Sequence, residues 1–399
     1  MDKFIREQNA RNEIPPFARA GDVPLSEMRH ILKACGDDES LKRGYVLARR
    51  FRDITRRACN YDMTSRCNLY CEGCFYFEGD AQTRLREKED LRDWELFFKR
   101  QAQENGVRYG YFAGAEPALA QDRLRAAARH IERGSISTNG TVRIDKSLPY
   151  AILVSVWGDE DETEKFRGGG TFHKALRNFA EDPRARFIYT VNRENVRNVR
   201  KVARILDSAG ASFSFNYYSP TASYLRKIGR AAQNDESFFR ISNPGYHLHF
   251  REEDLCGLHE TIGGIIDDFP KTCLHTKALN DWMLQGERYT VDGKTGVAVD
   301  CGGRNNAWHQ AYGVDQRPLQ TKCCTPNVDC RECRLYAPAL STALFRQGDY
   351  TADVGQFRKW LALCEQWGRL FLTDEDAAWD TSEPCSERDL PPLEQGGSL

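Results

Sequence analysis

The stretch DMTSRCNLYCEGCFYFEGD, residues 62–80, contains three cysteines in the pattern C-x3-C-x2-C. Cys67, Cys71 and Cys74 follow an apolar run at 58–63 that has the length and composition of a β-strand. Three thiolates on one loop fit an iron–sulfur cube and leave one iron without a protein ligand. An open metal position is where a substrate or cofactor binds, so the pattern indicates a catalytic centre. The alternative is a zinc site, which normally takes four ligands.

Five further apolar runs follow, and amphipathic helical segments alternate with them. These runs lie at 107–114, 134–140, 151–158, 186–192 and 212–218. One intervening helix shows the helical pattern clearly, because Val199, Val202 and Leu206 share a face and Gly210 closes the helix. Strand–helix units of this kind predict an α/β fold, a partial (β/α)6 barrel with right-handed connections. Its working loops lie at the carboxyl ends of the strands.

The pattern divides the chain into four regions. They are a helical N-terminal segment at 1–57, the partial barrel at 58–245, a small cysteine-rich α+β extension at 246–345 and a helical tail at 346–399. The tail contains the predicted helix QFRKWLALCEQWGRLFL.

Composition excludes several classes of partner. The 57 Lys and Arg nearly balance the 58 Asp and Glu, so we expect no nucleic acid and no anionic membrane surface as partner. The mean hydropathy is −0.64, and neither a secretion signal nor a run long enough to cross a bilayer is apparent, which predicts a cytoplasmic protein. In such a chain the 14 cysteines are better explained by metal binding than by disulfides.

The cysteine loop after the first strand resembles the signature of radical S-adenosylmethionine (SAM) enzymes. This resemblance implies a 4Fe-4S cluster on the three thiolates, with SAM bound at the open iron. One position departs from the family pattern, because Gly73 stands where an aromatic or apolar residue is usual. Phe75 and Tyr76 follow the third cysteine instead, and we expect them to flank the adenine of SAM.

The later strand ends extend the resemblance. FAGAEP at 112–117 is similar to the family's GGEP motif, which implies that Gly114 and Glu116 bind the amino group of SAM. Further SAM contacts are expected from polar residues after the next strands, namely Thr138, Ser155 and Asn192. The alternative for each of them is that it caps the following helix.

A second group of cysteines lies between 273 and 333 and resembles the Twitch or SPASM extensions of radical SAM enzymes. The resemblance implies one auxiliary 4Fe-4S cluster that transfers electrons. Its expected ligands are Cys273, Cys301, Cys330 and Cys333, and Cys323 or Cys324 can displace one of these. A closed zinc site is the alternative, because four thiolates complete a tetrahedron.

The resemblance implies an enzyme of the oxidoreductase or lyase type that cleaves SAM to a 5'-deoxyadenosyl radical. We expect this radical to take a hydrogen atom from a small molecule such as a sugar, a nucleoside or another natural-product intermediate. A flavodoxin or ferredoxin is the expected electron donor. Two alternatives remain open: a maturase of ribosomally made peptides, and a non-catalytic zinc-binding interaction protein. Cys256 is a candidate hydrogen donor and Tyr217 a candidate acid or base. The substrate, the net reaction and the oligomeric state are not determined by the sequence.

Overall fold

The computed structural model describes most of the chain. The described residues are 25–36, 38–78, 84–231, 238–286, 288–307 and 309–377. The rest of the predicted N-terminal segment and the end of the predicted C-terminal tail lie outside the described residues.

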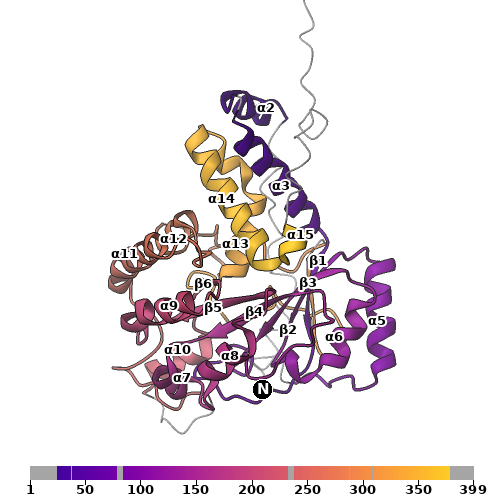
Figure 1. Cartoon of the computed structure of the whole chain (residues 1–399). Helices are drawn as coiled ribbons and strands as arrows, with labels where there is room; N and C mark the ends of the chain where they lie inside the picture. Colours follow the sequence, from indigo (N-terminus) through magenta and orange to yellow (C-terminus); the bar gives the residue numbers. More distant parts are fainter. Residues whose placement is uncertain are drawn as a thin grey trace, which may run out of the picture.

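A parallel sheet of seven strands forms the centre of the molecule, in the order β6-β5-β4-β3-β2-β1-β7 (Figure 1). The strands are β1 (Ala58–Asp62), β2 (Tyr109–Ala113), β3 (Arg133–Thr138), β4 (Ala151–Val156), β5 (Ala185–Val191), β6 (Phe213–Tyr217) and β7 (Gln310–Tyr312). β1 to β6 coincide with the apolar runs, so the predicted α/β fold and its parallel sheet are confirmed. β6 and β7 are the two edges of the sheet, which is therefore an open, partial barrel.

Alternate residues of the strands point to opposite faces of the sheet. Tyr61 of β1 and Phe112 of β2 face outward, where their rings stack at 5.8 Å and pack against helix α5 (Leu91–Gln103). Asn60 and Tyr111, one position earlier in each strand, face the interior and line a cavity. The outer face is therefore sealed by apolar packing, and the inner face presents polar groups.

Helices follow the strands in the alternation that the sequence predicts (Figure 1). Beyond α5 they are α6 (Gln121–Ala128), α7 (Glu160–Phe166), α8 (Thr171–Phe179), α9 (Val199–Ser208) and α10 (Ala222–Gly229), with short 3-10 turns at Pro117–Leu119 and Val196–Asn198. The face predicted for α9 is confirmed, because Val199, Val202 and Leu206 are buried. Gly210 ends this segment with a φ of +65°, a conformation that glycine adopts without strain.

The sequence pattern did not predict β7. This strand pairs with β1 in parallel, with Cys59 opposite Gln310 and Tyr61 opposite Tyr312. It has three residues, too few for a period-two pattern to be recognised. β7 brings the extension against the first strand of the barrel, beside the cysteine loop.

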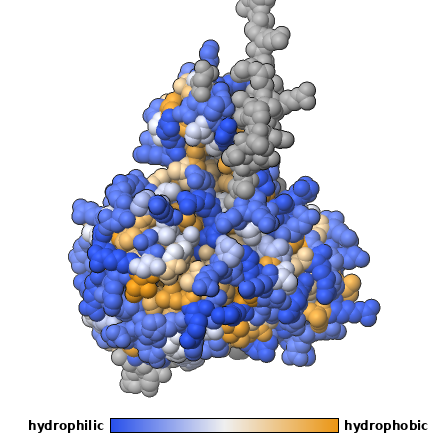
Figure 2. All heavy atoms as spheres, in the orientation of Figure 1, coloured by the Kyte–Doolittle hydropathy of each residue, from blue (hydrophilic) through white to orange (hydrophobic). Residues whose placement is uncertain are grey.

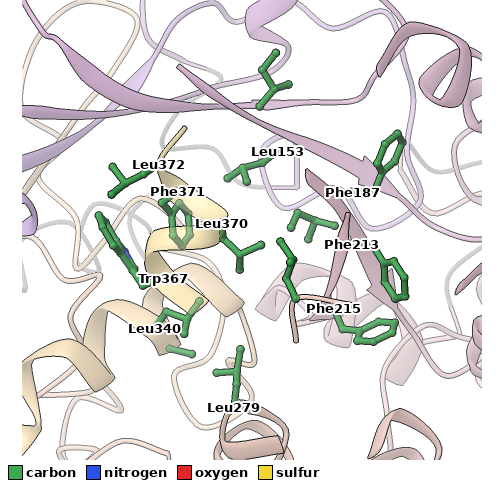
Figure 3. Packing of buried hydrophobic residues seen from close by; sticks show 14 of the residues in the cluster. Leu153, Phe187, Phe213, Phe215, Leu279, Leu340, Trp367, Leu370, Phe371 and Leu372 are labelled. Carbon is green, nitrogen blue, oxygen red and sulfur yellow. The ribbon is translucent and has the colours of Figure 1, made fainter. Parts of the chain in front are cut away.

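The helix predicted near the C-terminus is α14 (Val354–Phe371), and its end fills the inner side of the sheet. The rings of Trp367 and Phe371 lie 5.7 Å and 5.5 Å from those of Tyr109 and Tyr111. Figure 3 shows Trp367 and Phe371 gathered with buried residues of the strands and of the neighbouring helices. Two short elements flank α14, a 3-10 turn at Gln347–Tyr350 before it and α15 (Asp374–Ala377) after it.

The N-terminal helices α2 (Leu25–Ala34) and α3 (Glu39–Thr55) pack on α14 and project with it away from the barrel (Figure 1). A buried hydrogen bond of 2.7 Å from Arg52 Nη1 to Gln347 Oε1 joins α3 to the 3-10 turn that precedes α14. The face drawn in Figure 2 is largely hydrophilic, and apolar residues gather in patches in and below the neck that joins this projection to the barrel. Within the described part of the chain, no helix is both long and apolar enough to cross a bilayer.

The cysteine-rich extension begins with α11 (Glu252–Asp268) and α12 (Lys277–Leu284) and ends with α13 (Tyr336–Phe345). Between them lies a tight turn, where Val291 and Ala298 form an antiparallel bridge. The Asp292 backbone N–H donates to Val297 at 2.9 Å, and Gly296 has a φ of +69°. The turn leads directly into the segment that carries Cys301.

Candidate active site

A cavity of about 310 Å³ opens on the inner side of the barrel, at the carboxyl ends of β1 to β6. This volume is at the lower end of the range for small-molecule sites. The far wall is formed by 335–338, at the start of α13, and by Phe371 of α14. Ten of the candidate site residues named from the sequence line this cavity: Cys67, Cys71, Cys74, Phe75, Tyr76, Gly114, Glu116, Thr138, Ser155 and Cys324.

The start of the cysteine loop is held by the carboxylate of Glu87. This carboxylate accepts hydrogen bonds from the backbone N–H and hydroxyl of Ser65, at 2.8 Å and 2.5 Å, and from the Thr64 hydroxyl at 3.0 Å. It also pairs with Arg123 at 2.5 Å, and that guanidinium donates to the Met63 carbonyl. Burial alone would raise the pKa of Glu87, but the hydrogen bonds from Ser65, Arg123 and Thr64 hold this pKa at about 2. The ionised Glu87 carboxylate therefore fixes the chain at Ser65, which lies two residues before Cys67.

The middle of the loop is held by a second buried carboxylate, Glu72. It accepts from the backbone N–H groups of Arg240 and Ser242, at 2.8 Å and 3.1 Å. Gly73 follows with a φ of +57°, and a Cβ there would lie 2.0 Å from the Tyr218 hydroxyl. The Tyr218 side chain therefore occupies the space beside this position and supplies an aromatic wall there, which accounts for the glycine before Cys74.

The three thiols of the loop interact with one another. Burial raises the pKa of Cys67 and Cys74, and the neighbouring Cys71 raises both further. Without metal, the Cys67 and Cys74 thiols stay protonated, so metal binding at these two residues releases protons. Asn139 orients the first of them, because its Nδ2 lies 3.8 Å from Cys67 Sγ and 2.9 Å from Asn68 Oδ1.

Glu116 is 1% exposed and forms the link between the second and third strand ends. Its carboxylate accepts from the Thr138 hydroxyl at 2.7 Å, from the Asn139 backbone N–H at 2.7 Å and from the Ala118 backbone N–H at 3.0 Å. Burial raises its pKa against the effect of these hydrogen bonds. Gly114, two residues earlier, has a φ of +110°, and a Cβ there would collide with the backbone of 62–64. Glu116 therefore orders the site, and Gly114 lets the second strand end approach the first.

A buried cation, Arg167, also lines the cavity, and sequence reasoning missed it. It donates from Nη1 to the Ser155 carbonyl at 2.5 Å and lies over the Trp157 ring at 6.0 Å. Its Nε is buried without a hydrogen-bond partner among the described residues. It follows α7 in an ordinary polar segment, so no sequence signal distinguishes it from a surface arginine.

Phe75 and Tyr76 take different positions. Phe75 is 43% exposed at the mouth of the cavity, whereas Tyr76 is buried and contacts Phe77 edge-on at 5.1 Å. The hydroxyl of Tyr76 has no hydrogen-bond partner among the described residues.

Three candidates from the sequence lie outside the cavity lining. Asn192 caps its own turn, because its Oδ1 accepts from the backbone N–H groups of Glu194 and Asn195. Tyr217 points to the opposite side of β6 and donates to Asn280 at 3.0 Å. Cys256 is exposed on α11 and lines a different hollow of the surface.

The extension gathers four thiols in one place. Electrostatic repulsion couples Cys301 to Cys323, Cys330 and Cys333, and burial raises the pKa of Cys301 and Cys333. Cys273 lies apart from them, because it extends β6 as a parallel bridge to Phe213 and packs in the barrel core. Cys323 therefore replaces Cys273 in the group of four thiols that the sequence predicted, which is one of the replacements that the sequence left open.

Two cations flank these four thiols, a half-buried lysine and a buried arginine. Lys322 lies against Cys323 and Cys330, and these thiols raise its pKa although burial acts to lower it. Arg304 is 4% exposed beside Cys301 and donates to the Ala298 carbonyl. Positive charge at this position fits a centre in which several thiolates and sulfides carry negative charge.

The donor sets fit clusters better than single ions. Among the residues that the structure describes, no three His, Cys, Asp or Glu side chains converge on one metal ion. A cube needs no such convergence, because each thiolate binds a different iron at a different corner. The residues present are compatible with a three-thiolate cluster at the cavity and a four-thiolate cluster in the extension.

Comparison with known proteins adds a relative. No family model matches the chain. An Fe-coproporphyrin III synthase of Methanosarcina barkeri is 31% identical over 169 residues, which is 37% of this chain. The resemblance to radical SAM enzymes is confirmed. The chain spans 40% of the length of this curated relative.

Solved structures that resemble this chain have low sequence identity to it. Native anSMEcpe with bound AdoMet has a TM-score of 0.47 at 15% identity, covering 82% of this chain and 92% of that one. Streptococcus suis SuiB bound to its precursor peptide SuiA has a TM-score of 0.47 at 15% identity, covering 81% of this chain and 76% of that one.

Proposed function

We propose that the protein is an enzyme that reductively cleaves SAM and takes a hydrogen atom from a small polar molecule. The observation that supports this is the meeting, in one cavity, of three thiols with the polar ends of five strands. When bound, a 4Fe-4S cluster with SAM would supply the electron that splits a sulfonium carbon–sulfur bond, giving methionine and a 5'-deoxyadenosyl radical.

In this proposal the cavity residues hold SAM in place. Arg167 carries a buried charge with a free Nε donor, which suits the carboxylate of SAM. Glu116 lies close to this guanidinium and favours the ammonium group of SAM. Tyr218 and Trp157 line the cavity with flat apolar faces that suit adenine. Correct positioning is the main task of these residues, because the radical reacts with whatever bond lies beside it.

The floor of the cavity favours a small polar substrate. Four polar side chains line it, from three strands: Asn60, Asp62, Thr190 and Asn216. Asn60 donates from Nδ2 to His309 at 2.6 Å, which leaves its Oδ1 as an acceptor. Hydroxyl groups of a sugar or nucleoside match such a lining better than an apolar side chain does. The curated relative is also named for a small molecule, an iron porphyrin.

The four thiols of the extension are proposed to hold an auxiliary cluster of the Twitch or SPASM kind. The segment that carries them also reaches the cavity, since Cys324 and Thr325 line it. An electron could therefore pass between a substrate radical and the auxiliary centre over a short path, and a flavodoxin or ferredoxin would supply the reducing electrons.

The decisive experiment is anaerobic reconstitution with iron and sulfide, followed by incubation with SAM and dithionite. We expect release of 5'-deoxyadenosine, and loss of that release when Cys67, Cys71 and Cys74 are all replaced by alanine. Cys256→Ala serves as the matched control, because this thiol is exposed and outside the cavity. Zinc at the three thiolates, or unchanged release from the triple variant, would refute the proposal.

The substrate class needs a separate test. Panels of sugars, nucleosides and candidate precursor peptides are added to the active enzyme, and the rate of 5'-deoxyadenosine release is followed. Acceleration by a small polar molecule supports the proposed substrate class. Acceleration by a peptide alone would contradict it and support the peptide maturase instead.

A further inference from the structure

Cys324 and Cys323 are neighbours in the chain but belong to different sites. Cys323 groups with the other three thiols of the extension, beside Arg304, with which it forms an antiparallel bridge. Cys324 also lies close enough to Cys323 and Cys301 for their charges to act on its thiol, but unlike them it lines the barrel cavity, on the side where Tyr111 lies. One dipeptide thus presents a thiol to each of the two sites.

The surroundings of Cys324 provide a second observation that indicates a ligand. Tyr76 is 3% exposed and lines the same cavity, and its hydroxyl has no partner among the described residues. Asp62 lies close to both side chains, because its charge acts on the Tyr76 hydroxyl and on the Cys324 thiol. A buried hydroxyl without a partner is costly unless a bound molecule completes its hydrogen bonds. This corner of the cavity therefore has the composition of a substrate subsite.

We propose that Cys324 is the hydrogen-atom donor that quenches a radical formed on the substrate. This inference rests on the proposed function, because the substrate radical arises from SAM cleavage. The substrate first loses a hydrogen atom from a C–H bond. The Cys324 S–H bond then breaks, a new C–H bond forms on the substrate, and Cys324 is left as a thiyl radical.

One electron and one proton restore the thiol. The electron comes from a low-potential one-electron donor of the flavodoxin or ferredoxin class. The proton comes from solvent, with Asp62 close to the sulfur to relay it. The substrate then undergoes no net oxidation, so the reaction is a stereochemical inversion or another rearrangement in which hydrogen is returned.

Other cysteines are poor candidates for this role. Cys59, Cys273 and Cys364 are buried in the hydrophobic core, away from the cavity lining. Cys256, the candidate from the sequence, is exposed on α11 and lines another hollow. Cys324 is the thiol of the extension that the cavity lining includes.

The first test follows deuterium in turnover without added substrate. The reconstituted holoenzyme is incubated with SAM and dithionite in D2O, where thiol hydrogens exchange with solvent and carbon-bound hydrogens do not. Without substrate in the cavity, the 5'-deoxyadenosyl radical stands in for the substrate radical. An S–H bond is weaker than the C–H bond that forms, so this radical takes deuterium from Cys324 when it lies beside that thiol. We expect 5'-deoxyadenosine carrying one deuterium from the wild type and from Cys256→Ala, and loss of this label in Cys324→Ala and Cys324→Ser.

The second test does not depend on turnover. Iodoacetamide is added anaerobically to the holoenzyme, and the modified cysteines are mapped by mass spectrometry. We expect Cys324 to be modified and S-adenosylhomocysteine to slow this modification, while modification of Cys256 stays unchanged. Iron content should be the same in Cys324→Ala as in the wild type.

The outcomes separate this inference from the proposed function. Unlabelled 5'-deoxyadenosine from the wild type, or equal labelling in Cys324→Ala, would overturn the role of Cys324 and leave SAM cleavage standing. Loss of iron in Cys324→Ala would overturn it too, because the thiol would then be a cluster ligand. Absence of 5'-deoxyadenosine altogether would overturn both.

Discussion

At the scale of single residues, Glu87 is the side chain on which the order of the cysteine loop depends most directly. We predict that Glu87→Gln lowers the free energy of unfolding by about 2 kcal/mol, because charged hydrogen bonds are replaced and Arg123 loses its counter-ion. The variant should also retain less iron after reconstitution. Thermal unfolding and iron analysis check both effects.

The matched control for this change is Glu89→Gln, which alters an exposed carboxylate on the same segment. Surface changes of this kind usually shift stability by less than about 0.5 kcal/mol. If Glu87→Gln behaved like the control, the hydrogen bonds to Ser65 and Thr64 would not hold the loop.

His309 makes a pH-dependent contribution to stability. Burial lowers its pKa from the ordinary value of 6.5 to about 4, so the folded protein keeps this ring neutral and able to accept from Asn60. Below pH 6.5 the unfolded chain takes up a proton that the folded chain does not. The stabilising effect is therefore complete above 6.5 and falls by about 1.4 kcal/mol per pH unit towards 4.

Unfolding measured at about pH 7 and about pH 5.5 tests this contribution. We expect His309→Gln to lose less stability on acidification than the wild type, since glutamine keeps an acceptor and does not titrate. An equal slope for His309→Gln and the wild type would contradict the buried neutral state of His309.

At the scale of elements, the grouping of thiols in the extension predicts which cysteines bind the auxiliary cluster. Cys323→Ala should lose about half of the iron of the reconstituted protein, because one of two four-iron clusters loses a ligand. Cys273→Ala should keep the iron, since this thiol packs beside Phe213 in the core.

Iron analysis with absorption near 400 nm, a typical region for such clusters, measures both changes. The opposite pattern, with iron lost in Cys273→Ala and kept in Cys323→Ala, would restore the ligand set expected from the sequence and refute the grouping seen in the structure.

The elements that local pattern determines were predictable. The strands and α9 follow from runs of apolar residues and from a 3.6-residue period, which reflect burial on one or two faces. β7 was not predictable, because three residues carry no period. The place of Cys273 was also beyond sequence reasoning, because its bridge to Phe213 depends on how α11 and α12 return the chain to the sheet.

The candidate site divides in the same way. The cysteine loop and Glu116 were found because a motif places them at strand ends. Arg167 was missed, because it reaches the cavity through tertiary packing. Alternation within β1 places Asn60 and Asp62 on the same face of the sheet. The sequence therefore contained enough information to predict these two polar residues of the cavity floor.

At the scale of the whole molecule, three regions far apart in the sequence enclose one cavity. The barrel supplies the cysteine loop, the extension supplies 324–325 and the start of α13, and α14 supplies Phe371 to the far wall. The N-terminal helices brace this wall from outside, where the ring of Phe51 lies 5.7 Å from that of Trp367. The shape of the cavity and the stability of the fold therefore depend on the same packed centre.

The most direct test of the central claim is electron paramagnetic resonance of the reduced protein with and without SAM. A variant with Cys323 and Cys333 replaced by alanine removes the auxiliary centre and leaves one cluster signal. The account predicts that SAM changes this signal, because SAM binds the open iron of the cluster on Cys67, Cys71 and Cys74. A signal that SAM leaves unchanged, or one that survives replacement of those three cysteines, would contradict it.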